Sequence, residues 1–376
     1  MTRETFSTRI NPKALIVGIQ TPENYSIDIE SYFEEFRNLV ETNGIVYDHE
    51  VYMKLRSIEP STFITKGKLT ELICLCEKEN IEEVVFSEVL NTQQVKNLKK
   101  LLKVSVFDRT ELILEIFEKN ALSAEGKLQV ELAWLQHKKA RLAGRGIGMS
   151  QQAGHIGGRG PGETQKEKET QHIELHILKI KKNLERLSQV RATQRKQRLG
   201  TSTPRFCIIG YTNAGKSSLL NALTKSDVLA ENKLFATLDT TTRELFIDGK
   251  KKALISDTVG FIQQLPHSLI EAFKSTLDEL VYAHLLIHVV DSSNKNWQQH
   301  IRVVTTLLKE MGLEQKPLFT VFNKIDLLSE EEKQKLLVQA QEHAPFCLAS
   351  TLSDAGLQDL LSYLSSWTMP QESSHE

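Results

Sequence analysis

The chain contains 376 residues with a formal net charge of −1, and 40% of its residues are hydrophobic and 25% charged. This length favours two or three domains with separate cores, and the composition excludes a disordered or fibrous protein. No uncharged apolar run approaches about 18 residues and the N-terminus lacks the apolar core of a signal peptide, so we expect a cytoplasmic protein without a membrane span, with peripheral membrane association left open.

Residues 1–125 alternate short apolar runs with amphipathic stretches. The apolar runs predict strands over 14–19, 45–53, 83–87 and 104–107, and the stretches between them predict helices over 29–40, 69–79 and 93–102. This alternation indicates an independent α/β domain with a small parallel sheet. Cys74 and Cys76 lack the second half of a zinc site and are interpreted as small core residues.

Residues 126–199 form a second predicted domain, an antiparallel helical hairpin. Apolar residues recur at three- and four-residue spacing over 110–117, 128–142 and 173–187. The glycine-rich runs over 144–148 and 154–162 are incompatible with regular helix and predict a loop between the two arms.

The hairpin is markedly basic. Its cations include Lys138, Lys139, Arg141, Arg145, Lys179, Lys181, Lys182, Arg186, Arg191, Arg195, Lys196 and Arg198. They are either a solvated helix face or, because they cluster in a near-neutral chain, a surface for a phosphate backbone. No aromatic platform or zinc spacing accompanies them, so sequence-specific nucleic-acid readout has no support.

Residues 200–367, followed by a polar tail over 368–376, contain a phosphate-loop motif between a buried strand pattern and a helix. The motif G-x-x-x-x-G-K-S comprises Gly210, Tyr211, Thr212, Asn213, Ala214, Gly215, Lys216 and Ser217. Its glycines let backbone N–H groups surround phosphate oxygens at a helix N-terminus. Lys216 is expected to reach the β- and γ-phosphates and to act in catalysis, and Ser217 to offer its hydroxyl to Mg²⁺.

A second motif closes the next strand pattern with Asp257, Thr258, Val259 and Gly260. In this arrangement the Asp257 carboxylate holds Mg²⁺ through water, and the N–H of Gly260 senses the γ-phosphate, which makes Gly260 a catalytic candidate. Phe261 occupies the position where many GTPases carry a water-orienting glutamine, so we expect slow intrinsic hydrolysis that depends on a partner.

The base-recognition motif comprises Asn323, Lys324, Ile325 and Asp326. A carboxylate at Asp326 accepts hydrogens from guanine N1 and the 2-amino group, whereas adenine offers no such pair, so the predicted ligands are GTP and GDP. Ser350, Thr351 and Leu352 fit the last base-contacting loop, although Thr351 stands where alanine is usual.

The segment before the second motif is the predicted switch. Its nucleotide-binding candidates are Phe235, Ala236, Thr237, Leu238 and Asp239. We expect Thr237 to bind Mg²⁺ and sense the γ-phosphate, with Thr241 and Thr242 as alternatives and an ordinary surface hydroxyl as the simpler interpretation. Asn213 is either a ligand of a monovalent cation such as K⁺ or a loop-stabilising asparagine.

The motifs together resemble the HflX family of translational GTPases. The resemblance rests on the phosphate loop, the run 159–165 (Arg-Gly-Pro-Gly-Glu-Thr-Gln), the runs 63–69 and 125–132, Phe-Ala-Thr-Leu-Asp at 235–239 and Asp-Thr-Val-Gly-Phe-Ile at 257–262. It implies an α/β fold with an N-terminal α/β domain, a helical hairpin and a Ras-like P-loop GTPase domain with a mixed, mostly parallel sheet.

The resemblance also implies a function. Members bind the 50S ribosomal subunit, the GTP-bound form splits stalled 70S ribosomes, and hydrolysis releases the protein. We expect a monomer that contacts 23S rRNA, with Arg145, Arg159 and Gln165 as candidate RNA contacts. After Gln165 the chain departs from the family pattern, which leaves the RNA contacts there open, as is any ATP binding by the N-terminal domain. The alternatives are a GTP-gated RNA chaperone or ribosome-assembly factor, and a regulatory module that recruits a protein.

Overall fold

The computed structural model describes residues 12–22, 24, 28–143, 161–199, 203–224, 234, 235, 238, 240–263, 269, 279–353 and 355–369. The chain divides into two compact units, Met1–Lys119 with Leu128–Asn183, and Asn120–Lys127 with Leu184–Glu376. Among the described residues, no helix is long and apolar enough to cross a membrane.

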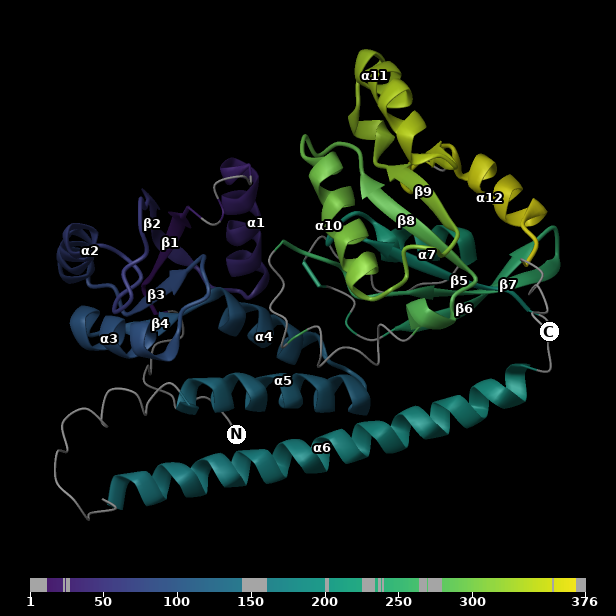
Figure 1. Ribbon diagram of the computed structural model, residues 1–376. Coiled ribbons are helices and arrows are strands. Elements are labelled where there is room, and N and C mark those ends of the chain that lie inside the picture. The colour runs from purple at the N-terminus through teal and green to yellow at the C-terminus, as the bar shows by residue number, and fades with distance from the viewer. Residues whose placement is uncertain are drawn as a thin grey trace. The chain divides into compact units, whose positions relative to one another are not determined.

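The first unit contains a four-stranded sheet in the order β2-β1-β3-β4, and each adjacent pair is parallel. The strands are β1 (Ala14–Gln20), β2 (Tyr47–Lys54), β3 (Glu83–Phe86) and β4 (Ser105–Phe107), and the helices between them are α1 (Ile29–Thr42), α2 (Lys66–Glu79) and α3 (Thr92–Leu102). The predicted α/β class is confirmed (Figure 1).

The two faces of this sheet carry different helices. Val17 and Ile19 belong to a core with residues of α2 and α3, whereas a Cβ added to Gly18 would lie 3.0 Å from the ring of Phe33 in α1. Because successive strand residues point to opposite faces, α1 packs on the face away from α2 and α3. Cys76 is buried in the α2 core, but Cys74 is exposed, so the core prediction was wrong for Cys74.

A buried polar cluster lies at the carboxyl ends of these strands. Arg109, the first residue of α4 (Arg109–Asn120), is fully buried, donates to Glu35 and lies 5.0 Å from the ring centre of Tyr32. Glu88, whose pKa is raised by burial, accepts from the Tyr32 hydroxyl at 2.9 Å and from Asn24 at 3.0 Å. These groups partner one another, so the buried charges are compensated within the fold.

The predicted hairpin consists of α5 (Ala124–Ala143) and α6 (Pro161–Leu199). The two arms run antiparallel (Figure 1). An ion pair joins Lys138 to Glu169 at 3.2 Å, and Nε2 of His176 lies 3.3 Å from Glu131, a contact that is ionic when the imidazole is protonated. Lys139 pairs with Glu174 at 2.8 Å, so two of the predicted phosphate-binding cations also contact acids of the hairpin.

The prediction that residues 161 and 162 belong to the loop was wrong, because α6 begins at Pro161. Proline suits the first helical position, where its missing N–H would have no partner and its fixed φ already matches the helix.

The second unit contains a six-stranded sheet in the order β10-β9-β8-β5-β7-β6, in which only the described β6–β7 pair is antiparallel. The strands are β5 (Arg205–Gly210), β6 (Thr241–Ile247), β7 (Lys250–Asp257), β8 (Leu285–Asp291), β9 (Leu318–Asn323) and β10 (Phe346–Leu348). The mixed, mostly parallel sheet of the prediction is therefore confirmed.

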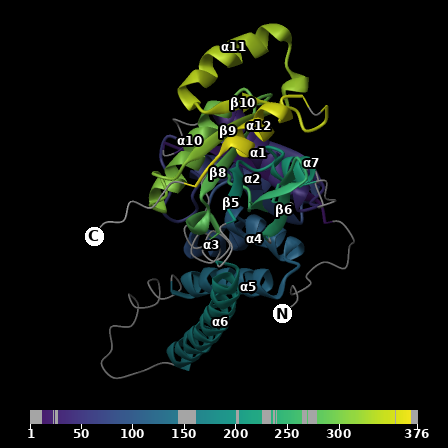
Figure 2. The ribbon, with the colours of Figure 1, turned by 90° about the vertical axis from the view of Figure 1, so that its right-hand side faces the viewer.

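Helices cover both faces of this sheet. They are α7 (Lys216–Thr224), α10 (Trp297–Glu310), α11 (Glu330–Ala340) and α12 (Leu357–Ser366), with short 3₁₀ helices η1 (Ile325–Leu327) and η2 (Gln341–His343). Phe206 and Ile208 of β5 share a core with α7 and α12, whereas Cys207 and Ile209 share a core with α10 (Figure 2). The alternation of β5 thus fixes α10 on the face opposite α7.

Candidate nucleotide-binding site

The predicted motifs meet at the carboxyl edge of the second sheet. β5 leads into the phosphate loop at Gly210, while the parallel strands β7, β8 and β9 end at Asp257, Asp291 and Asn323. In open α/β sheets, ligands bind at this edge. Two close approaches require glycine there. A Cβ at Gly210 would lie 2.2 Å from the carbonyl oxygen of Val289, and one at Gly215 would lie 2.2 Å from Nδ2 of Asn323.

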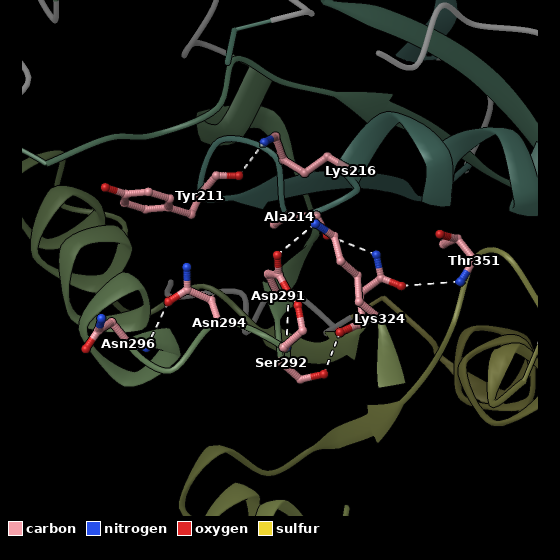
Figure 3. Close-up of polar contacts among 11 residues, drawn as sticks. Tyr211, Ala214, Lys216, Asp291, Ser292, Asn294, Asn296, Lys324 and Thr351 are labelled. Atoms are coloured by element: carbon pink, nitrogen blue, oxygen red, sulfur yellow. Dashed lines mark hydrogen bonds and ion pairs between the residues drawn. The ribbon is translucent and has the colours of Figure 1, made fainter. Parts of the chain in front are cut away.

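Lys216 lies buried at the start of α7, and its amine donates to the carbonyl oxygen of Tyr211 at 2.7 Å (Figure 3). Burial lowers the pKa of Lys216 to about 8, and the negative charge of Asp257 opposes this shift. A single carbonyl compensates a buried ammonium poorly, so the geometry favours an anion as its further partner.

Ser217 and Asp257 are in direct contact, since the Ser217 hydroxyl donates to Oδ2 of Asp257 at 2.5 Å. The other carboxylate oxygen of Asp257 accepts from the N–H of Thr258 at 2.9 Å, which fixes the plane of the carboxylate. A hydroxyl and a carboxylate side by side form an oxygen donor set of the kind that Mg²⁺ prefers, so these residues fit the ion.

Gly260 lies beside the phosphate loop. A Cβ added to it would fall 2.9 Å from Nζ of Lys216 and 2.8 Å from Cγ2 of Thr212, so the two predicted catalytic residues, Lys216 and Gly260, are neighbours. The next residue, Phe261, is 2% exposed and packs in the core beneath α10. Phe261 is therefore a core residue, and its apolar ring cannot orient a water molecule as a glutamine would.

The predicted base-recognition residues form a polar network around Asn323. Asn323 donates to the carbonyl oxygen of Ala214 at 2.9 Å and accepts from the N–H of Thr351 at 3.3 Å, so it joins the phosphate loop to the last predicted loop. Asp326, in η1, accepts a hydrogen bond from the Ser350 hydroxyl. The side chains predicted to read guanine therefore lie within one contiguous cluster.

Sequence reasoning assigned no role to Asp291 and Ser292. Asp291 forms an ion pair with Lys324 at 2.7 Å, and the Ser292 hydroxyl donates to the carbonyl oxygen of Asn323 at 2.6 Å (Figure 3). These contacts hold the loop predicted to recognise the base to the end of β8. The available signal was the placement of Asp291 at the carboxyl end of a buried strand pattern.

Several predicted residues are placed elsewhere or lie outside the described chain. Ala236, Thr237, Asp239, Arg145 and Arg159 lie outside the described residues, and Gln165 lies within α6. Phe235 and Leu238 are buried, and Leu352 is exposed. Asn213 is exposed with φ +59°.

The two alternative switch threonines belong to β6. Thr241 is paired with Asp257 in the β6–β7 register, and the Thr242 hydroxyl lies 2.8 Å from the Ser256 hydroxyl. The Thr242 hydroxyl therefore has a hydrogen-bond partner within the sheet and needs no metal ion to satisfy it.

Comparisons with known proteins match this arrangement. Residues 30–118 match the GTP-binding GTPase N-terminal family, 120–198 the GTP-binding GTPase middle region, and 205–324 the 50S ribosome-binding GTPase family. GTPase HflX of Caldanaerobacter subterraneus subsp. tengcongensis is 44% identical over 85% of this chain and 74% of its own length. GTPase HflX of Escherichia coli is 40% identical over 80% of this chain and 70% of its own length. The crystal structure of the complex of SsGBP with GDP aligns at 25% identity with a TM-score of 0.50, covering 94% of this chain and 97% of that one.

Proposed function

This chain belongs to the HflX family of GTPases, and we propose that its GTP-bound form binds the 50S ribosomal subunit and dissociates stalled or idle 70S ribosomes. The GTPase domain hydrolyses GTP to GDP and phosphate, and this hydrolysis releases the protein from the subunit. The observation that carries the proposal is that one chain contains both a basic hairpin and a sheet edge where the phosphate loop, Asp257–Gly260 and Asn323–Asp326 meet.

In this proposal the phosphate end of the site uses Lys216, Ser217 and Asp257. Lys216 exchanges the Tyr211 carbonyl for the β- and γ-phosphates, and the neighbouring N–H of Gly260 meets the γ-phosphate. Ser217 would hold Mg²⁺ directly and Asp257 through water, with Thr237 completing the set, and the ion would neutralise phosphate charge. The present hydrogen bond between Ser217 and Asp257 must open for this.

At the base end, Asp326 accepts from guanine N1 and the 2-amino group in exchange for the Ser350 hydroxyl. Lys324 is held by Asp291, and Asn323 keeps the phosphate loop and the base loop in register. Ser350, Thr351 and Leu352 line the remaining side of the base. This arrangement supports a specificity for GTP and GDP.

The ribosomal part of the proposal is supported by the exposed cations of α6. Lys179, Lys182 and Arg186 are exposed on this helix, where they are available to rRNA phosphates. The matched family description of residues 205–324 points to the same partner. We propose 23S rRNA as the contact, reached by Arg145, Arg159 and Gln165, and a monomeric, cytoplasmic protein with domains 1–125, 126–199 and 200–367.

Co-sedimentation with purified 50S subunits tests the proposal. The protein with a non-hydrolysable GTP analogue is expected to pellet with 50S, whereas the protein with GDP stays in the supernatant, and light scattering is then expected to show loss of 70S particles. Equal binding in both nucleotide states, or no binding to 50S, contradicts the proposal.

Paired charge reversals test the hairpin. Lys182→Glu with Arg186→Glu is expected to weaken 50S binding and to flatten its dependence on salt, because fewer counterions are released. Lys309→Glu with Lys335→Glu, on α10 and α11, changes the charge equally and is expected to leave binding intact.

A GTP-gated RNA chaperone or ribosome-assembly factor is the second candidate, because exposed cations on a helix bind RNA phosphates of any particle. It predicts GTP-dependent annealing of RNA strands without splitting of 70S particles.

We also propose Asn213 as a K⁺ ligand, since it is exposed on the phosphate loop. Faster hydrolysis in K⁺ than in Na⁺, lost in Asn213→Ala, is the expected result, and equal rates in both salts contradict it.

A further inference from the structure

The aromatic ring of Tyr211, the second residue of the phosphate loop, is stacked on the imidazole of His300. The ring centres are 3.8 Å apart and the planes are inclined by 4°. Tyr211 is 5% exposed and His300, in α10, is 7% exposed. A parallel, buried stack of this kind fixes the direction of the phenol, because neither ring has room to turn.

The phenol of Tyr211 reaches the segment that follows the second motif. Its hydroxyl oxygen accepts from the N–H of Gln263 at 2.9 Å. Two backbone hydrogen bonds hold the same segment to the phosphate loop, from Thr212 N–H to Phe261 O at 2.8 Å and from Phe261 N–H to Gly210 O at 3.2 Å. Tyr211 supplies a side-chain anchor for this segment, and the two backbone bonds are independent of residue type.

The anchored segment begins one residue after Gly260. Two residues before Gly260, the hydroxyl of Thr258 donates to the carbonyl oxygen of Ile208 at 2.7 Å. The backbone at Gly260 is therefore held between a side-chain bond to β5 and the bond from Gln263 to Tyr211. Phe261 is buried in the core and offers no polar group to the γ-phosphate. Hydrolysis therefore depends on the position of the Gly260 N–H.

The imidazole of His300 contacts Tyr211 by ring stacking. Its Nδ1 atom is buried and finds no hydrogen-bond partner among the described residues. Burial lowers the pKa of His300 to about 4, although Asp291 opposes the shift, so the ring stacks in its neutral form at pH 7. A substitution of His300 by an uncharged aromatic residue is therefore expected to preserve the stack on Tyr211.

We propose that Tyr211 and His300 are positioning residues for GTP hydrolysis: the phenol of Tyr211, held by stacking on His300, fixes Gln263 and thereby the Gly260 N–H that meets the γ-phosphate. Neither side chain touches the reacting atoms. The role concerns intrinsic hydrolysis, so it is measured without ribosomes and stands apart from the proposed ribosomal partner.

Tyr211→Phe is the central test, because it removes one oxygen atom and keeps the stack. Loss of a neutral hydrogen bond that acts on the transition state is expected to lower kcat about three- to tenfold. The Kd for a fluorescent GDP is expected to change by less than about twofold, because GDP carries no γ-phosphate. Hydrogen exchange of the segment 259–263 is expected to quicken. The control Tyr363→Phe, on α12, makes the same chemical change and is expected to alter none of these quantities.

The His300 variants separate stacking from imidazole chemistry. His300→Leu is expected to lower kcat as Tyr211→Phe does, and His300→Phe to retain the kcat of the natural protein. An unchanged kcat in Tyr211→Phe overturns the proposal, as does a parallel loss of GDP affinity and kcat, which would mark a purely structural role. A fall in His300→Phe equal to that in His300→Leu also overturns it.

Discussion

Both units place polar side chains at the carboxyl ends of parallel strands, but the two edges use them differently. In the first unit Arg109 and Glu35 form a buried ion pair, and Glu88 accepts from Tyr32 and Asn24. In the second unit Lys216 donates to a backbone carbonyl and Ser217 contacts Asp257 beside glycines that leave no room for a side chain. Buried charges that pair with each other are compensated within the fold, and removing one partner destabilises it, whereas charges with exchangeable partners suit a ligand.

The largest effect is expected where the first edge is broken. Arg109→Met leaves Glu35 and Glu88 buried without their cation and is expected to lower the free energy of unfolding by about 3–5 kcal/mol. Urea unfolding followed by hydrogen exchange measures the loss in the first unit. The double variant Arg109→Met with Glu35→Leu is expected to recover part of it, and equal stability of the single variant and the natural protein would contradict the comparison.

Lys216→Ala removes the cation at the edge of the second sheet and is expected to reduce activity rather than stability. Removing this cation is expected to lower kcat for GTP about 10²- to 10³-fold and to weaken nucleotide binding. The nucleotide-free Tm is expected to stay constant or rise, because burial already disfavours the charged amine. Phosphate release and thermal unfolding are the measurements, and a normal hydrolysis rate would remove Lys216 from the site.

Asp326→Asn is expected to move specificity from guanine to xanthine nucleotides by on the order of 10²-fold, because the amide presents a donor to guanine donors. Competition binding with GDP and XDP measures the ratio. Glu330→Gln, a carboxylate-to-amide change on the exposed first turn of α11, serves as the matched control. Undiminished preference for GDP would show that Asp326 does not read the base.

A smaller difference between the units is expected in how their free energies of unfolding change as the pH falls. In the second unit, burial lowers the pKa of His288 to about 3 and of His300 to about 4, from 6.5, so the unfolded chain binds more protons below pH 6.5. Each histidine then reduces the free energy of unfolding by about 1.4 kcal/mol per pH unit.

In the first unit the shifts of Glu111 and His137 oppose each other, and the raised pKa of the buried Glu88 acts in the same direction as that of Glu111. Burial raises the pKa of Glu111 to about 7, which favours the folded state as the pH falls from 7 towards 4.5, while burial lowers the pKa of His137 to about 4. Hydrogen exchange between pH 6.5 and 4.5 is expected to show greater destabilisation of the second unit. His288→Gln is expected to reduce that difference, and an equal response of both units would contradict it.

The sequence was sufficient for the strands that carry the motifs and for the motifs at their ends, because a phosphate loop, an Asp-x-x-Gly turn and an Asn-Lys-x-Asp turn each require a fixed backbone context. It did not predict β6, whose first residues, Thr241 and Thr242, were interpreted as part of the switch. It was insufficient for contacts set by packing. The ion pair of Lys324 with Asp291 and the stack of Tyr211 on His300 join segments far apart in the chain, and no local pattern specifies them. The buried Arg109 was missed for the same reason, since a charged residue in an amphipathic stretch predicts exposure.

The most direct test of the central claim uses Asp326→Asn with purified 50S subunits. If the carboxyl edge of the second sheet is the guanine site that controls subunit binding, this variant is expected to co-sediment with 50S in the presence of a non-hydrolysable XTP analogue and to remain in the supernatant with the GTP analogue. The natural protein is expected to show the reverse preference. Co-sedimentation of the variant that is equal with both analogues would contradict the account.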